Sequence, residues 1–210
     1  MTNFKSYFSS FNSLVWCLAI LFCLANSVEA SNANLNYRGF EVNFTEIENS
    51  PEKNTILTAV KAQIDIVEKV NLSDDNLKFF QSVPLVMLAD ASGTPGVYDG
   101  EKKTVFLKGR SLASDKPILL HEFLHAYHQQ KLPDGFRNAQ INQFYLRAKE
   151  VFPEYADEYF LSNNREYFAV TASIYLFGRI GRPPYDLKTI KDKQPFYYQY
   201  LDSLFAPSKK

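Results

Sequence analysis

The stretch His121-Glu122-Phe123-Leu124-His125 organises the rest of the chain. In a helix, residues four apart project from one face, so the imidazoles of His121 and His125 can reach a single metal ion while Glu122 stands beside it. This spacing is typical of zinc metallopeptidases, in which the glutamate is the general base. The alternative is that the two histidines only fill surface or core positions of an amphipathic helix, because so short a motif also occurs by chance.

The residues around this motif predict a helix. Ser114 or Asp115 is the expected N-cap, and Pro117 suits the first turn. Pro133 and Gly135 should end the helix. An apolar stripe with i, i+3, i+4, i+7 spacing runs beside the histidines and consists of Leu120, Phe123, Leu124 and Tyr127. The helix therefore has one face for packing and a separate face for metal chemistry.

Length and composition indicate one globular domain with a substantial core, since the chain has 210 residues and 46% hydrophobic content. Lys and Arg total 23, as do Asp and Glu, so the overall charge gives no sign of a nucleic-acid or acidic-membrane partner. We expect a monomer whose partner is a peptide or protein substrate.

Residues 1–30 have the features of a secretory signal peptide. Lys5 precedes an apolar run over residues 14–25, which is shorter than the roughly 20 residues that span a bilayer. We predict cleavage after Ala30 and a single domain over residues 31–210, secreted or in the periplasm or cell envelope, without stable membrane association. The alternative is an uncleaved N-terminal anchor. Because Cys17 and Cys23 both lie in this segment, the mature domain would have no thiol for a disulfide, for catalysis or for zinc.

The order of hydrophobic patterns predicts an α+β fold with a small N-terminal mixed sheet and a mainly helical C-terminal half. Strands are expected over residues 37–45, 83–88 and 104–107, and helices over 51–70 and 74–81. After Gly135 the patterns are all helical, in segments around 141–151, 167–177 and 197–204.

The strand over residues 104–107 follows Asp99-Gly100, a dipeptide that favours a hairpin. In zinc peptidases such a strand commonly lies along the cleft, where its free edge can pair with an extended peptide. An ordinary hairpin with a covered edge is the alternative.

Catalytic zinc usually has three protein ligands and leaves one position for water, so the two histidines need a third partner. Lys131 stands where a metzincin would have its third histidine, which excludes that class. His128 lies seven residues from His121, roughly 10 Å along a helix, and is too far to share the ion. We therefore assign His128 a structural or cleft-rim role.

Glu166 is the better candidate for the third ligand, because residues 167–177 follow it without another charge. A carboxylate in so apolar an environment is costly unless it is paired or binds a metal. The alternative is a solvated Glu166 in the first helical turn, where the helix dipole favours a negative charge.

Several segments resemble the catalytic domain of anthrax lethal factor and the related Pro-Pro endopeptidases, which are gluzincin-type zincins. They are residues 121–126, Tyr159 with Asn163, residues 166–169 and residues 195–201. The resemblance covers roughly the last hundred residues and implies a zincin-like fold with Glu166 as third zinc ligand. It also implies that Tyr159 assists the transition state. Leu124 and Val170 depart from the family pattern, where a small and an acidic residue are usual.

We therefore expect a secreted zinc endopeptidase in which one zinc ion activates water and Glu122 takes its proton. Asn163 is expected to cap the helix that carries Glu166. Two alternatives remain at this stage. One is a secreted binding module that keeps a zincin fold without catalysis, and the other is zinc-assisted hydrolysis of a non-peptide amide or ester.

Overall fold

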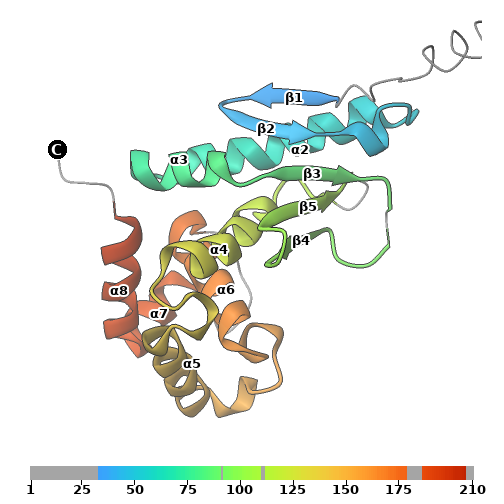
Figure 1. Cartoon of the computed structure of the whole chain (residues 1–210). Coiled ribbons are helices and arrows are strands. Elements are labelled where there is room, and N and C mark those ends of the chain that lie inside the picture. The colour runs from blue at the N-terminus through green and yellow to red at the C-terminus, as the bar shows by residue number, and fades with distance from the viewer. Residues whose placement is uncertain (1–32, 91, 110–111, 179–185, 207–210) are drawn as a thin grey trace, which may run out of the picture. The chain divides into compact units, whose positions relative to one another are not determined.

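The computed structural model describes residues 33–90, 92–109, 112–178 and 186–206, which belong to one compact α+β unit (Figure 1). The predicted signal peptide, its cleavage site and both cysteines lie outside the described residues. No helix within the described ranges is long and apolar enough to cross a membrane.

Five strands form one mixed sheet in the order β1-β2-β3-β5-β4. Neighbours β2, β3 and β5 run parallel, while β1 and β4 are antiparallel strands at the two edges. The small mixed sheet predicted for the N-terminal half is thus confirmed. The strands are β1 (Asn34–Tyr37), β2 (Phe40–Asn43), β3 (Leu85–Leu88), β4 (Gly96–Asp99) and β5 (Thr104–Lys108).

The prediction of one strand over residues 37–45 was wrong, because the chain reverses inside this range. Arg38 and Gly39 both have positive φ, 51° and 80°, and form a tight turn between β1 and β2. Two successive residues in the left-handed region are characteristic of two-residue hairpins. The alternation over residues 40–43 therefore belongs to the second strand of a hairpin.

The predicted hairpin around Asp99-Gly100 is confirmed, but its two strands have other places in the sheet than expected. Strand β5 lies inside the sheet between β3 and β4, and β4 is the edge strand. The cleft-side strand is therefore Gly96–Asp99 and not residues 104–107. Its sequence was missed because Gly93, Pro95 and Gly96 make the whole segment resemble a turn.

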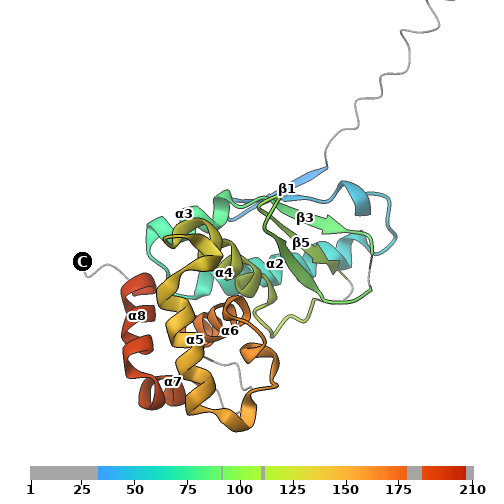
Figure 2. The ribbon, with the colours of Figure 1, turned by 60° about the horizontal axis from the view of Figure 1, so that its bottom comes forward.

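One face of the sheet is buried against three helices, α2 (Lys53–Lys69), α3 (Asp74–Ser82) and α4 (Ile118–Lys131), as Figures 1 and 2 show. The ring of Phe123 on α4 stacks on Phe40 of β2 and on Phe80 of α3, with centroids 5.7 and 5.3 Å apart. Helix α4 is therefore fixed to the sheet through its apolar stripe, whose four predicted members are all buried. The side chains that point from the sheet into this core are Phe40, Val42, Leu85, Met87, Val105 and Leu107.

The described part of the chain after Gly135 is helical, as predicted. Its final helix returns to the N-terminal half, because the side chain of Asn76 donates to the Leu204 carbonyl at 2.9 Å and Phe205 packs on Tyr127. Helix α7 was not predicted. The elements are η3 (Gly135–Arg137), α5 (Ala139–Val151), η4 (Pro153–Tyr155), η5 (Tyr159–Leu161), α6 (Asn164–Phe177), α7 (Leu187–Lys193) and α8 (Pro195–Phe205).

The start of α4 differs from the prediction of an N-cap at Ser114 or Asp115. The helix begins at Ile118, and Pro117 occupies the N-cap position, where its side chain makes no capping hydrogen bond. The cap comes from α2 instead. Gln63 accepts a hydrogen bond from the Leu119 amide at 3.0 Å, and its side-chain nitrogen donates to the carbonyls of the preceding loop, those of Ala113 and Lys116.

The Gln63 side chain is fully buried, so water cannot replace these bonds. We predict that Gln63→Ala lowers the free energy of unfolding by about 3 kcal/mol, since several buried polar groups lose their partner at about 1–3 kcal/mol each. Urea denaturation of the metal-free protein measures this. The control is Gln81→Ala, which removes a partly exposed bond to the Arg38 carbonyl and should cost less than about 1 kcal/mol. Equal losses for the two variants would contradict a capping role for Gln63.

Candidate metal centre

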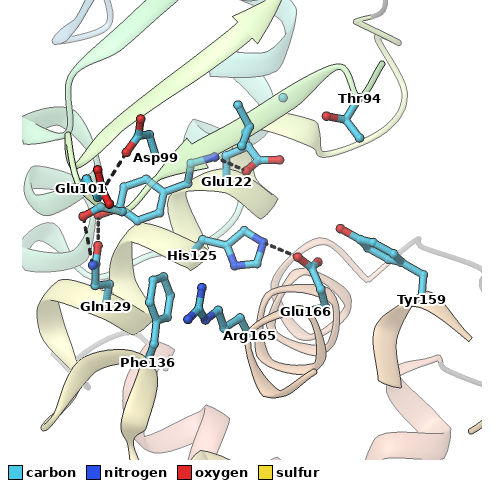
Figure 3. Close-up of a pocket in the computed structure, with 14 residues that line it drawn as sticks. Thr94, Asp99, Glu101, Glu122, His125, Gln129, Phe136, Tyr159, Arg165 and Glu166 are labelled. Atoms are coloured by element: carbon cyan, nitrogen blue, oxygen red, sulfur yellow. Dashed lines mark hydrogen bonds and ion pairs between the residues drawn. The ribbon is translucent and has the colours of Figure 1, made fainter. Parts of the chain in front are cut away.

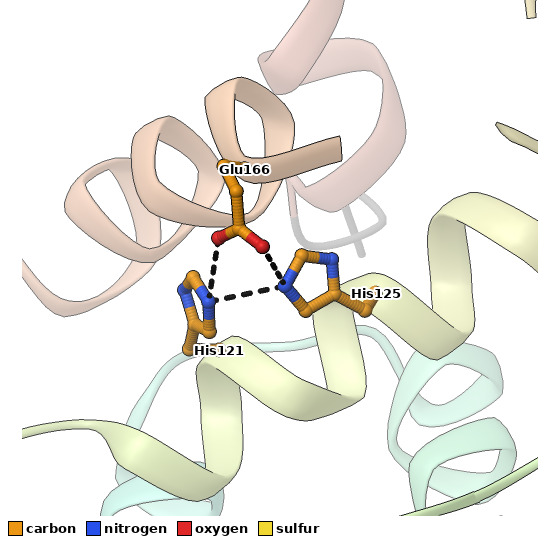
Figure 4. A group of neighbouring side chains, drawn as sticks. All are labelled: His121, His125 and Glu166. Atoms are coloured by element: carbon orange, nitrogen blue, oxygen red, sulfur yellow. Dashed lines mark hydrogen bonds and ion pairs between the residues drawn. The ribbon is translucent and has the colours of Figure 1, made fainter. Parts of the chain in front are cut away.

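Three potential ligand atoms from α4 and α6 converge on one point (Figure 4). The Nε2 atoms of His121 and His125 are 3.1 Å apart. The Glu166 carboxylate places Oε2 3.3 Å from His121 Nε2 and Oε1 3.4 Å from His125 Nε2. The structure thus brings together all three residues that the sequence predicted as zinc ligands.

The spacing of these atoms fits a zinc ion. Ligands held tetrahedrally at about 2.0–2.1 Å from zinc are separated from each other by about 3.4 Å. The three observed separations, 3.1, 3.3 and 3.4 Å, are close to that value. In addition, Glu166 Oε2 is buried without a hydrogen-bond partner in the described part of the chain, although it lies within ion-pair distance of His121 Nε2. A carboxylate oxygen in this situation needs a cation.

Helix α6 positions Glu166 through contacts at its first turn. Asn163 caps the helix as predicted, since its side-chain oxygen accepts from the Arg165 and Glu166 amides at 2.9 and 3.0 Å. The next residue, Asn164, donates to the Phe136 carbonyl at 3.2 Å and so ties this turn to the loop after α4. Glu166 therefore faces the histidines from a fixed helix end, and the solvated alternative does not describe this residue.

The electrostatic surroundings keep Glu166 ionised. Burial by itself raises the pKa of this carboxyl, but contacts with His121, His125 and the Tyr159 hydroxyl outweigh burial and hold the pKa well below its usual range. An ionised carboxylate is the form that binds metal.

Tyr159 lies at the other side of the site (Figure 3). Its hydroxyl contributes to the low pKa of Glu166, and its side chain remains 49% exposed. The next two residues, Phe160 and Leu161, are buried, and Tyr145 donates to the Leu161 carbonyl at 3.1 Å. The short helix η5 is thus anchored in the core while it presents Tyr159 to the site.

Glu122 is buried next to the cluster, and its carboxylate is held by the edge strand of the sheet. Its Oε2 accepts a hydrogen bond from the Tyr98 amide of β4 at 2.8 Å (Figure 3). Burial raises the pKa of Glu122, and the Tyr98 hydrogen bond and the charge of His121 act in the opposite direction. The sequence did not identify Tyr98, because its contribution comes from a backbone amide that any residue would supply.

Gly96 permits the close approach of β4 to α4. A Cβ atom at this position would lie 3.0 Å from Glu122 Cγ, 3.1 Å from Glu122 Oε1 and 3.2 Å from Ile118. These distances are shorter than ordinary van der Waals contacts. Because Gly96 has no side chain, β4 can pack directly against the Glu122 side chain.

The cluster opens into a pocket of about 740 Å³ (Figure 3). Strand β4 and the turn after it form one wall, and helices α4 and α6 with η3 form the opposite side. The pocket therefore joins two of the three candidate ligands, His125 and Glu166, with the buried Glu122 and the edge strand of the sheet in one cavity. Its functional lining includes Glu122, His125, Tyr159, Glu166, Phe136 and Arg165.

His128 has the structural role predicted for it and does not lie on the cleft rim. Its side chain is completely buried between the rings of Phe136 and Phe168, with centroids 5.3 and 4.9 Å away. Neither ring nitrogen has a hydrogen-bond partner within the described residues. Burial lowers the pKa of His128 to about 3, with smaller contributions from His125 and Arg165.

The sequence matches no family model and no curated protein. Among solved structures, the chain is similar to a Pro-Pro endopeptidase (PPEP-2) from Paenibacillus alvei, with 21% sequence identity and a TM-score of 0.48. The similarity covers 72% of this chain and 90% of that chain. At this level of similarity, the assignment of the site rests on the distances and contacts described above.

We predict that Glu166→Gln weakens zinc binding at least about a hundredfold, because a neutral amide replaces an ionised ligand. Zinc content after dialysis, followed by competition with a chromogenic chelator, measures this. Tyr159→Phe is the control: it removes a hydroxyl next to the same carboxylate but no ligand, so it should retain about one zinc per chain. Undiminished zinc binding by Glu166→Gln would rule out Glu166 as a ligand.

The buried His128 should make the folded protein less stable in acid. Because the pKa of His128 is about 3 in the folded chain and 6.5 in the unfolded chain, only the unfolded chain binds this proton between those values. Stability therefore falls as the pH falls from about 6.5. From pH 7 to pH 5 the contribution of His128 to this loss is about 2 kcal/mol.

His128→Leu should remove that part of the loss. Urea denaturation at both pH values, with EDTA present to exclude metal effects, gives the comparison between the variant and the unmodified chain. If both proteins lose the same free energy between pH 7 and pH 5, His128 is not buried in its neutral form.

Proposed function

We propose that this protein is an exported zinc-dependent endopeptidase of the gluzincin type, with Glu122 as its general base. The observation that carries the proposal is the position of Glu122: a buried carboxylate stands between a three-ligand cluster and the free edge of a β-sheet. The ligand set agrees with the one implied by the resemblance to lethal factor and the Pro-Pro endopeptidases. Export rests on the predicted signal peptide.

His121, His125 and Glu166 would hold the zinc ion. When bound, zinc supplies a Lewis acid that lowers the pKa of water and polarises the carbonyl to be attacked. A structural zinc site would not need a buried base beside it, so Glu122 favours catalysis over a purely structural role.

The two carboxylate oxygens of Glu122 have different roles in this proposal. Because Oε2 accepts a hydrogen bond from the Tyr98 amide, Oε1 is the atom that would take the proton of the attacking water and later deliver it to the leaving amine. The burial that raises the pKa of Glu122 brings its proton affinity nearer to the value that suits a base at neutral pH.

The Tyr159 hydroxyl would donate a hydrogen bond to the oxygen that gains negative charge in the transition state. Its hydroxyl influences the Glu166 carboxylate electrostatically, and its half-exposed side chain borders the pocket. A substrate carbonyl bound next to Glu166 would therefore lie within reach of this donor.

The substrate we propose is a peptide in extended conformation, paired with β4. Hydrogen-bonded pairs alternate along the antiparallel β4–β5 ladder, and the Lys108 amide donates to the Pro95 carbonyl. The N–H and C=O groups of Gly96 and Tyr98 therefore point away from β5, toward the open edge of the sheet. The Tyr98 bond to Glu122 confirms that direction for one of them. Because Glu122 already uses the Tyr98 amide, an added strand would pair with the remaining outward groups, those of Gly96 and the Tyr98 carbonyl, and would lie next to Glu122.

The test is Glu122→Gln. This variant should bind zinc as the unmodified chain does, while hydrolysis of peptides from a random library falls at least about a hundredfold. Glu154→Gln is a control with the same chemical change at an exposed position outside the pocket, and it should leave activity unchanged. Retained activity in Glu122→Gln would refute the mechanism. Zinc binding without hydrolysis by the unmodified chain would instead favour a binding module.

A further inference from the structure

Arg165 is the only Lys or Arg among the residues that line the pocket, and it precedes the metal ligand Glu166 in the chain. Its side chain is exposed to solvent. Within the described residues, no carboxylate forms a salt bridge with it. The guanidinium group of Arg165 is therefore available to a ligand in the pocket.

The position of this cation is fixed by an aromatic stack. The guanidinium carbon lies 4.3 Å from the centroid of the Phe136 ring, between that ring and His125 in the view of Figure 3. On its buried side, Phe136 contacts His128 edge-on, and its carbonyl accepts the hydrogen bond from Asn164. The ring is a rigid platform, so Arg165 loses little conformational freedom when it binds a partner.

Stacking on an aromatic face leaves the edge of a guanidinium free. That edge carries parallel N–H donors that match the two oxygens of a carboxylate, in a bidentate geometry that a lysine cannot provide. The complementary group for this site is therefore a carboxylate.

We infer that Arg165 determines specificity by binding a substrate carboxylate near the scissile bond, because Arg165 lines the same pocket as His125 and Glu166. The inference rests on the proposed peptidase function. The carboxylate belongs either to an Asp or Glu side chain or to the free C-terminus of a short peptide.

The opposite wall should confine this preference to one position. Asp99 ends β4, Glu101 lies on the turn that follows, and both line the pocket. Asp99 accepts hydrogen bonds from the amides of Glu101 and Lys102, which hold its carboxylate in place, and the exposed Lys102 ammonium is 3.8 Å from it. A substrate carboxylate on that side meets two carboxylates, of which Asp99 is partly neutralised by Lys102, whereas one next to Arg165 is paired.

The experiment compares peptides that differ only by Glu or Gln, at each of three positions on both sides of a cleaved bond. A second set compares a free C-terminal carboxylate with its amide at each length. For the unmodified chain we expect kcat/KM to favour the carboxylate about tenfold or more at one position, as expected for a hydrogen-bonded charge pair. The two sets distinguish a side-chain carboxylate from a chain terminus.

Arg165→Gln should bring this ratio close to one, Arg165→Lys should restore part of it, and Arg165→Glu should favour Lys at the same position. Arg137→Gln is the matched control, because it removes an exposed arginine next to Phe136 that does not line the pocket. It should keep the full preference. A ratio near one in the unmodified chain, or a preference that survives in Arg165→Gln, would overturn the inference.

A binding measurement separates this inference from the proposed function. Zinc-loaded Glu122→Gln is titrated with the same Glu and Gln peptides by calorimetry, with and without Arg165→Gln. A carboxylate preference that requires Arg165 supports the inference even if the unmodified chain hydrolyses none of the peptides, in which case only the peptidase proposal fails. Binding without a preference, or no binding at all, overturns the inference.

Discussion

The convergence of two imidazole nitrogens and a carboxylate within 3.1–3.4 Å is the constraint on which the rest of the structure depends. The ion pairs with His121 and His125 stabilise the ionised Glu166, yet its Oε2 has no hydrogen-bond partner in the described part of the chain, as expected for an atom placed to bind a cation. These few contacts between partly exposed groups do not by themselves fix the two helices. Packing and capping elsewhere must fix α4 and α6 so that the ligands stay in place.

Each helix is fixed from outside its own sequence neighbourhood. Gln63 of α2 caps α4, and the rings of Phe40 and Phe80 hold its apolar stripe. Helix α6 is tied to α4 through Phe168, which packs on His128, and to η3 after α4 through Asn164. A completely buried histidine without hydrogen bonds is an unusual core residue. Here it supports Phe136, and through Phe136 it supports the cation on the pocket wall.

Strand β4 both completes the sheet and contacts the proposed general base. As an edge strand it has backbone groups that β5 does not use, and one of them, the Tyr98 amide, holds Glu122. Gly96 lets the strand come this close. One strand thus orients the general base and offers the edge where an extended peptide can pair, so the same geometry that buries Glu122 would also place a scissile bond above it.

The sequence by itself determined the α+β class, the helix of the HEFLH motif and the cap at Asn163, and it predicted the three candidate ligands that the structure brings together. These follow from local spacing, from a charge followed by an apolar run and, for Glu166, also from the family resemblance. It did not determine the turn at Arg38-Gly39, the edge position of β4, the cap from Gln63 or the contact of Tyr98 with Glu122. A polar Gln63 inside an apolar stripe was the one signal available for its role. The turn is local, and Gly39 was its overlooked signal. Only the tertiary structure decided the other three features, because each depends on a partner far away in the sequence or on backbone groups that every residue shares.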